Sequence, residues 1–154
     1  MSQARPSGAA APDRRPLCVD LDGTLLATDT LHELALALAR ERPVDLLRLP
    51  FWLARGRAGL KARLGARVKL DPALLPYRPE VIAALRDARA EGRRCVLVTA
   101  ADAALAESIA AHLDLFDEVL ASDGRDNLKG RRKADRLVER FGAGAFEYLG
   151  DAAA

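Results

Sequence analysis

Two acidic residues near the start of the chain follow an apolar segment and are separated by a single residue. Asp20 and Asp22 belong to the stretch Asp20-Leu21-Asp22-Gly23-Thr24, which comes directly after Leu17-Cys18-Val19. The apolar segment predicts a buried strand, and the glycine permits a sharp turn after it. Ligands bind at the carboxyl edge of parallel sheets, where these carboxylates could hold a hard cation and one could attack phosphorus.

The reaction that fits such a pair is phosphoryl transfer, which needs a nucleophile, an acid/base for the leaving oxygen, a cation and donors for the phosphate oxygens. We predict that Asp20 is the nucleophile, and that Asp22 protonates the leaving group and then activates water. The predicted phosphate-binding residues are Thr24, Thr99 and Lys129. The predicted Mg²⁺ ligands are Asp20, Asp22 and Asp151.

Two lysines compete for the phosphate-binding position. Lys129 directly precedes the predicted start of a helix at Gly130, where free backbone N–H groups would accompany its ammonium group. Lys133 lies one helical turn further along the chain. We favour Lys129 because it stands at the junction of loop and helix, and the sequence leaves the choice open.

Strand-like and helical segments alternate over most of the chain. The predicted strands cover residues 17–21, 94–99, 118–121 and 146–150. The predicted helices between them cover residues 79–92, 102–113 and 130–141. This alternation predicts an α/β fold with a parallel sheet covered by helices on both faces, and it brings the candidate site residues to one edge of that sheet.

A long helical stretch interrupts this alternation after the first strand. The pattern Thr30-Leu31-His32-Glu33 resembles a capping box and opens a helix, Pro50 interrupts the next helical segment, and a third helix covers 58–69. We therefore predict a disordered leader at 1–15, a core formed by 16–27 and 78–154, and a helical insertion at 28–77.

Composition excludes some classes of function. The net charge of +2 gives no general case for binding nucleic acid, and no segment is long and apolar enough to span a membrane. Cys18 and Cys95 fall in separate predicted strands, so we expect buried, reduced thiols and a cytoplasmic protein. His32 and His112 lie on predicted helices, and we assign neither a role.

Four segments together resemble the ordered motifs of the haloacid dehalogenase (HAD) superfamily. They are Asp20-Leu21-Asp22-Gly23-Thr24, Leu97-Val98-Thr99-Ala100, Asn127-Leu128-Lys129-Gly130 and Tyr148-Leu149-Gly150-Asp151. The resemblance implies a Rossmann-like core and an Mg²⁺-dependent aspartyl-phosphate mechanism, with the backbone carbonyl of Asp22 as a metal ligand. The helical insertion resembles the C1-type cap of phosphoserine-phosphatase-like members.

A narrower resemblance concerns the arrangement of the whole protein. The segments 49–56, 75–77, 115–124 and 127–130 look like the HAD domain fused ahead of UbiA-family membrane prenyltransferases. The superfamily usually carries a second acid after Asp151 and a further strand, which the three alanines at 152–154 do not supply. We therefore expect the chain to be the front piece of a larger protein, acting in the cytoplasm or at the cytoplasmic face of a membrane.

Three functions remain open at this stage. The first is an Mg²⁺-dependent phosphomonoester hydrolase that acts on a small phosphorylated metabolite or a polyprenyl-linked phosphate. The second is a non-catalytic accessory domain that regulates a prenyltransferase. The third is a 2-haloacid dehalogenase, which would use Asp20 but would not need Asp22.

One further feature has two interpretations. Residues 55–69 contain six basic side chains and no acid, which is typical of a solvated helix face but would also attract an anionic substrate or membrane surface. Phe51 and Trp52, just before this run, are expected in a core, although exposed aromatic rings there could touch a membrane interface.

Overall fold

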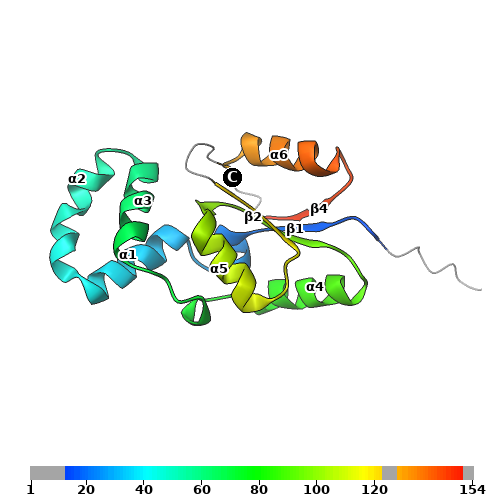
Figure 1. The fold of residues 1–154 in the computed structure, drawn as a ribbon, viewed down its shortest axis with the longest axis horizontal. Coiled ribbons are helices and arrows are strands. Elements are labelled where there is room, and N and C mark those ends of the chain that lie inside the picture. Colours follow the sequence, from blue (N-terminus) through cyan, green and yellow to red (C-terminus); the bar gives the residue numbers. More distant parts are fainter. Residues whose placement is uncertain (1–12, 123–127, 151–154) are drawn as a thin grey trace, which may run out of the picture.

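The computed structural model describes residues 13–122 and 128–150, and Figure 1 shows their arrangement. Four parallel strands form one sheet in the order β3-β2-β1-β4. Their bounds are Leu17–Asp20 (β1), Cys95–Asp102 (β2), Glu118–Ser122 (β3) and Glu147–Leu149 (β4). This is the α/β Rossmann-like sheet that the alternation of segments predicts, and the predicted fold class is confirmed.

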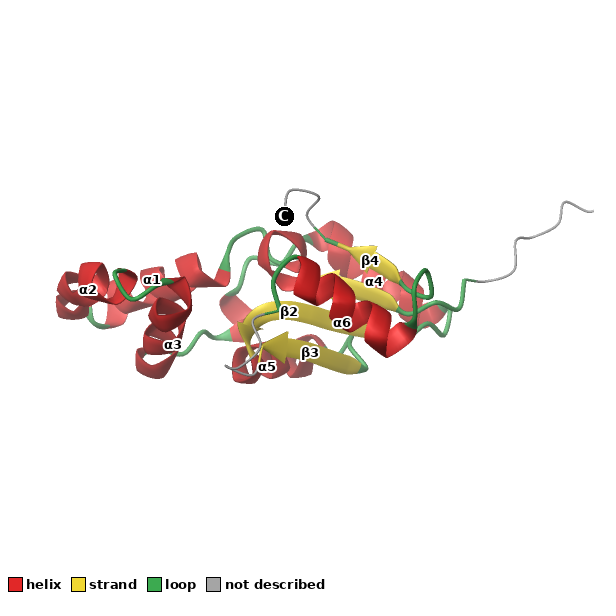
Figure 2. Cartoon of the chain, turned by 90° about the horizontal axis from the view of Figure 1, so that it is seen from above, coloured by secondary structure: helices red, strands yellow, loops and turns green. Residues whose placement is uncertain are grey.

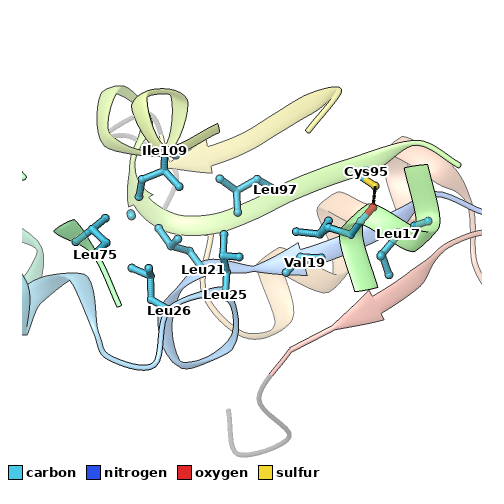
Figure 3. Packing of buried hydrophobic residues seen from close by; sticks show 13 residues of the cluster. Leu17, Val19, Leu21, Leu25, Leu26, Leu75, Cys95, Leu97 and Ile109 are labelled. Atoms are coloured by element: carbon cyan, nitrogen blue, oxygen red, sulfur yellow. Dashed lines mark hydrogen bonds between the residues drawn. The ribbon is translucent and has the colours of Figure 1, made fainter. Parts of the chain in front are cut away.

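Helices cover both faces of this sheet (Figure 1 and Figure 2). The helices of the core are Pro79–Ala90 (α4), Ala103–Leu113 (α5) and Arg131–Phe141 (α6). Alternate residues of β1 point to opposite faces, so Val19 packs with the cluster under α4 and α5, whereas Cys18 packs with Leu137 of α6. Figure 3 shows the larger cluster, in which the Cys95 thiol lies 3.9 Å from the Leu85 carbonyl oxygen.

A group of helices between β1 and β2 lies beyond one end of the sheet (Figure 1). We call residues 28–77 the helical insertion. Its elements are Thr30–Glu41 (α1), a 3₁₀ segment Pro43–Arg48 (η2), Leu49–Leu53 (α2), Arg57–Arg67 (α3) and a short 3₁₀ turn Pro72–Leu74 (η3). It has a hydrophobic cluster of its own, formed by Leu34, Leu38, Trp52, Leu60, Leu64 and Val68.

The start of the insertion differs in one detail from the prediction. The residue that caps α1 is Asp29, whose carboxylate accepts a hydrogen bond of 2.7 Å from the backbone N–H of Leu31. Thr30 is instead the first helical residue, and the Glu33 side chain accepts a hydrogen bond from the Thr28 hydroxyl. Because an Asp precedes the Thr, the cap moves back by one position.

The second strand also differs from the prediction, since it continues beyond Thr99 to Asp102. Regular pairing with β3 holds up to Val98 opposite Leu120 and resumes at Asp102 opposite Ser122. The register shift therefore falls between Val98 and Asp102, an interval that begins with Thr99.

None of the helices within residues 13–122 and 128–150 has the length and apolar character needed to traverse a lipid bilayer.

Candidate functional site

The turn after β1 fixes the first acid at the carboxyl edge of the sheet. Asp20 ends the strand in extended backbone conformation, and its Oδ1 accepts a hydrogen bond of 2.9 Å from the backbone N–H of Leu21. A wide helical turn follows, closed by Leu26 N–H donating to Leu21 C=O over 2.9 Å. Gly23 has a φ of 74° inside this turn, a value that favours glycine. The Asp20 side chain remains 15% exposed, which leaves it accessible to a ligand.

The second acid joins the sheet edge to the helical insertion. Oδ1 of Asp22 accepts a hydrogen bond of 2.7 Å from the backbone N–H of Thr30, at the start of α1. Its Oδ2 lies 3.9 Å from Nζ of Lys61 in α3, and both side chains are about three-quarters buried. The insertion therefore supplies a backbone donor and a cation to the acid that the sequence predicts as the proton donor.

The lysine that reaches the first acid is Lys133, which corrects the prediction. Its Nζ donates to Oδ1 of Asp20 over 2.7 Å, and the two side chains are only 13% and 15% exposed. Lys129 lies before the helix and is exposed. Lys133, rather than Lys129, therefore steadies the nucleophile candidate, whereas phosphate binding by Lys129 stays a prediction.

The geometry of α6 explains this correction. Gly130 adopts φ 51° and ψ −120°, so the helix begins only at Arg131. Side chains in a helix lean toward its N-terminus, which here faces the carboxyl edge of the sheet. Lys133 precedes the buried Leu137 by four residues and so shares its inward face. This spacing was the sequence signal that could have identified Lys133.

The two threonines of the predicted site are both buried. Thr99 directly follows Val98, the partner of Asp20 in the sheet register, and its Oγ1 accepts a hydrogen bond of 3.0 Å from the Ala101 N–H. Thr24 is 8% exposed, and its Oγ1 has no hydrogen-bond partner among the described residues. A buried hydroxyl without a partner is costly, which suits a group that awaits a ligand.

The end of β4 brings a residue that sequence reasoning missed. Burial raises the pKa of the Tyr148 phenol to about 12, and the negative charge of Asp20 adds to this rise. The Tyr148 ring also lies against Gly150, where a Cβ atom would come within 2.6 Å of Cζ. A larger residue at position 150 would therefore require the Tyr148 ring to move. The predicted metal ligand Asp151 follows it, outside the described residues.

The chemistry of the available donors suits a hard cation such as Mg²⁺, which prefers oxygen ligands. Oδ2 of Asp20 accepts no hydrogen bond from any described residue, so this carboxylate oxygen remains available. Within the part of the chain that the structure describes, no group of three acids, histidines or cysteines is gathered closely enough to hold a metal. Asp151 stays the predicted third acid of such a site.

A hollow of about 510 Å³ lies within the helical insertion. Its lining is mainly apolar, with leucines from α1, η2, α2 and α3. Two lining residues, Asp29 and Leu60, directly precede Thr30 and Lys61, which contact Asp22. Residues that line the hollow are thus next in sequence to residues that contact Asp22, although neither Asp20 nor Asp22 lines the hollow.

Comparison with known proteins gives this arrangement a family. Residues 17–152 match the family of haloacid dehalogenase-like hydrolases, and the chain belongs to this family. A curated relative, the uncharacterized protein y4nM of Sinorhizobium fredii (strain NBRC 101917 / NGR234), is 45% identical over 144 residues. The match covers 92% of this chain but only 28% of that protein, so the chain spans less than a third of its relative.

Solved structures agree on the fold. A probable phosphoserine phosphatase from Vibrio cholerae has a TM-score of 0.57 at 16% identity, over 92% of this chain and 53% of that chain. The L-2-haloacid dehalogenase RSc1362 has a TM-score of 0.52 at 17% identity, over 88% of this chain and 77% of that chain. One fold thus serves proteins named for two chemistries, and the site residues must indicate the reaction.

Proposed function

We propose that the chain is an Mg²⁺-dependent phosphomonoester hydrolase that acts through an aspartyl-phosphate intermediate at Asp20. The observation that carries this proposal is the pairing of Asp20 with Lys133 at 2.7 Å, with Asp22 two residues further on. A carboxylate nucleophile, a fixed cation and a second carboxylate are the groups that phosphoryl transfer needs.

Each residue has a defined task in this reaction. A carboxylate oxygen of Asp20 attacks phosphorus and breaks the bond to the leaving oxygen, which takes a proton from Asp22. Asp22 then removes a proton from water as the water oxygen attacks the phosphorus of the aspartyl phosphate, which releases phosphate and restores Asp20. Lys133 holds Asp20 in position and offsets negative charge, while Thr24 and Thr99 donate to phosphate oxygens.

The metal requirement rests on the same acids. Asp20, the backbone carbonyl of Asp22, and Asp151 would hold Mg²⁺, which would offset the charge of the nucleophile and the phosphate. The oxygen-only donor set of this chain supports the choice of a hard cation.

The contacts of Asp22 favour a phosphatase over a 2-haloacid dehalogenase. Dehalogenation would use Asp20 alone, whereas here the backbone of Thr30 and the ammonium group of Lys61 both converge on Asp22. The nearness of a partly buried cation, Lys61, to this second acid also supports catalysis over a purely accessory role.

The substrate class is a small phosphorylated metabolite or a polyprenyl-linked phosphate. The apolar hollow beside α1 and α3 supports the second, because it could receive part of a hydrocarbon chain. We further propose that residues 28–77 act as a C1-type cap over the acids. The greater length of the relative y4nM is compatible with a fused membrane prenyltransferase. We propose that the chain then acts in the cytoplasm or at the cytoplasmic face of the membrane.

Hydrolysis of para-nitrophenyl phosphate in the presence of Mg²⁺ tests the proposal. Asp20→Asn should lower kcat by at least about a thousandfold, because an amide cannot replace the nucleophile. Asp135→Asn is a matched control, since Asp135 lies exposed on α6 and should retain activity. Removal of Mg²⁺ by a chelator should abolish turnover. Equal turnover in Asp20→Asn and the parent protein would refute the assigned nucleophile.

A further inference from the structure

The outer end of the helical insertion presents a row of apolar side chains to solvent. Val44, Leu47 and Phe51 are 75%, 76% and 75% exposed, and they recur at a spacing of three and then four residues along η2 and α2. This spacing places them on one side of the segment. We call these three residues the apolar row. In Figure 1 the segment lies at the extremity of the insertion, far from the sheet.

Buried contacts on the inner side of the segment hold the apolar row in place. Asp45 is buried and pairs with Arg48 at 3.0 Å and with Arg67 of α3 at 2.8 Å. The Arg67 guanidinium lies 5.1 Å from the ring centroid of the buried Trp52. Asp45 and Trp52 therefore anchor the inner side of the segment while Leu47 and Phe51 remain outside.

Charge is distributed very unevenly around this row. Residues 40–69 contain nine lysines and arginines but only two acids, which gives a net charge of +7. The whole chain has a net charge of +2, so the remaining residues carry −5. Of the two acids, Asp45 is buried in ion pairs. Exposed arginines flank the apolar row on both sides in the sequence, namely Arg40 and Arg42 before it and Arg55 and Arg57 after it, and the exposed Arg48 lies between Leu47 and Phe51.

We propose that the outer end of the insertion, residues 40–57, docks on the surface of a bilayer that contains anionic phospholipids. A bilayer surface accepts apolar side chains at the level of the headgroups and attracts arginines around them. Each basic residue near an anionic surface strengthens this attraction. An anionic bilayer therefore matches both features of this surface: its apolar interior accepts the apolar row, and its headgroups attract the arginines.

Other partners match only part of this surface. Nucleic acid would satisfy the arginines but would leave the apolar row without a match. A second copy of the chain would cover the apolar row but would bring two basic docking surfaces together, each with a net charge of +3 over residues 40–57. The exposure and charge of residues 40–57 carry the inference without the proposed fusion or the proposed hydrolysis.

Sedimentation with vesicles tests the docking surface. The chain should bind vesicles of phosphatidylglycerol and phosphatidylcholine, bind phosphatidylcholine vesicles far more weakly, and lose affinity at high salt. The double variant Leu47→Asp, Phe51→Asp should lose about tenfold or more in vesicle affinity. Leu74→Asp is a matched control, because Leu74 is 81% exposed but lies in η3, outside the docking surface.

Fluorescence tests insertion directly and reports on folding. In a Trp52→Phe background, Phe51→Trp should shift its emission to the blue on anionic vesicles, whereas the buried Trp52 of the parent chain should show no shift. Parent-like circular dichroism of the double aspartate variant would confirm that it folds. Three results would overturn the proposal: no binding to anionic vesicles, equal losses in the control, or a concentration-dependent dimer that the double variant abolishes.

Discussion

At the scale of single residues, the contact between Lys133 and Asp20 defines the site. A lysine and an aspartate that are both more than four-fifths buried form an ion pair of 2.7 Å at the carboxyl edge of the sheet. Burying a charged pair costs desolvation energy, so such a pair contributes little to stability by itself. Its position beside a second carboxylate gives it a functional explanation.

Replacement of the two competing lysines separates their roles. Lys133→Met should lower kcat for an aryl phosphate by about a hundredfold to a thousandfold, because it removes the cation that positions Asp20. Lys129→Met is the matched control and should have little effect, since Lys129 is exposed and precedes α6. Steady-state kinetics of both variants measure the difference. A larger loss for Lys129→Met would restore the original prediction.

Much of the site could be predicted from residue types, and one error shows where this fails. Asp20 and Asp22 could be proposed from the sequence, because two acids directly after a buried strand suit ligand binding at the edge of a sheet. The sequence offered both Lys129 and Lys133 and favoured the first, because the reach of Lys133 depends on where α6 begins, and that start is set by the backbone angles of Gly130. Lys61 could be seen only as part of a basic run, since its contact with Asp22 requires the packing of α3.

The buried thiols predict how stability depends on pH. Burial raises the pKa of the Cys18 thiol from 9.0 to about 12, with a smaller contribution from Glu118. Below pH 9 the thiol is protonated in both states, so its contribution to stability is fully present. Between pH 9 and 12 only the unfolded chain ionises, so rising pH favours unfolding by at most about 1.4 kcal/mol per pH unit.

Melting temperatures measured from pH 8 to pH 11 check this prediction. The parent chain should lose stability with rising pH, and Cys18→Ala should show a shallower decline, even if its starting stability is lower because of the cavity that it leaves. Identical slopes for the two proteins would contradict the argument. Burial also raises the pKa of the Cys95 thiol and raises the pKa values of Tyr77 and Tyr148 to about 12, so these three groups should account for the decline that remains.

At the scale of elements, the alternation of strands and helices predicted the sheet, because the two central strands, β1 and β2, show the continuous apolar pattern that burial on both faces requires. Val96 and Val98 of β2 pack toward α6, whereas Cys95 and Leu97 pack toward α4 and α5. The continuation of β2 to Asp102 was not predictable, because it depends on a register shift against β3. Local sequence thus predicts the presence of a strand or helix more reliably than the residue at which it ends.

The start of α6 is the element boundary on which the site depends most. Gly130 adopts φ 51° and ψ −120°, a conformation that other residues rarely enter. Gly130→Ala should destabilise the chain by about 1–3 kcal/mol and lower activity, because a shifted helix start would move Lys133 away from Asp20. Thermal unfolding and steady-state kinetics measure the two effects.

A second glycine provides the control for this substitution. Gly65 lies within α3, exposed, with no atom within 4 Å of an added Cβ. Gly65→Ala should stabilise the chain by about 0.5–1 kcal/mol, because alanine restricts the unfolded chain and suits a helix. If Gly130→Ala were equally well tolerated, the backbone at residue 130 would not control the position of Lys133.

At the scale of the whole molecule, two hydrophobic clusters are joined by a narrow connection. The cluster under α4 and α5, which includes Leu75 from the end of the insertion, is separate from the cluster that α1, α2 and α3 form, and Leu70 packs against both. Two chain segments link them side by side, since Ala27 N–H donates to Pro76 C=O and Arg78 N–H donates to Leu25 C=O, each over 2.9 Å. We therefore predict that the insertion opens locally while the sheet stays folded.

Hydrogen exchange measured residue by residue tests this division of the fold. Amides of α1 and α3 should exchange through local opening, at a lower free energy than amides of β1 and β2. Leu70→Ala should accelerate exchange in α1 and α3 by about tenfold while leaving β1 and β2 nearly unchanged, because it removes a partly buried side chain that contacts both clusters. If all four elements exchanged at one free energy and shifted together in the variant, the insertion and the sheet would unfold as a single unit, and access of a substrate to Asp20 would need a route other than opening of the insertion.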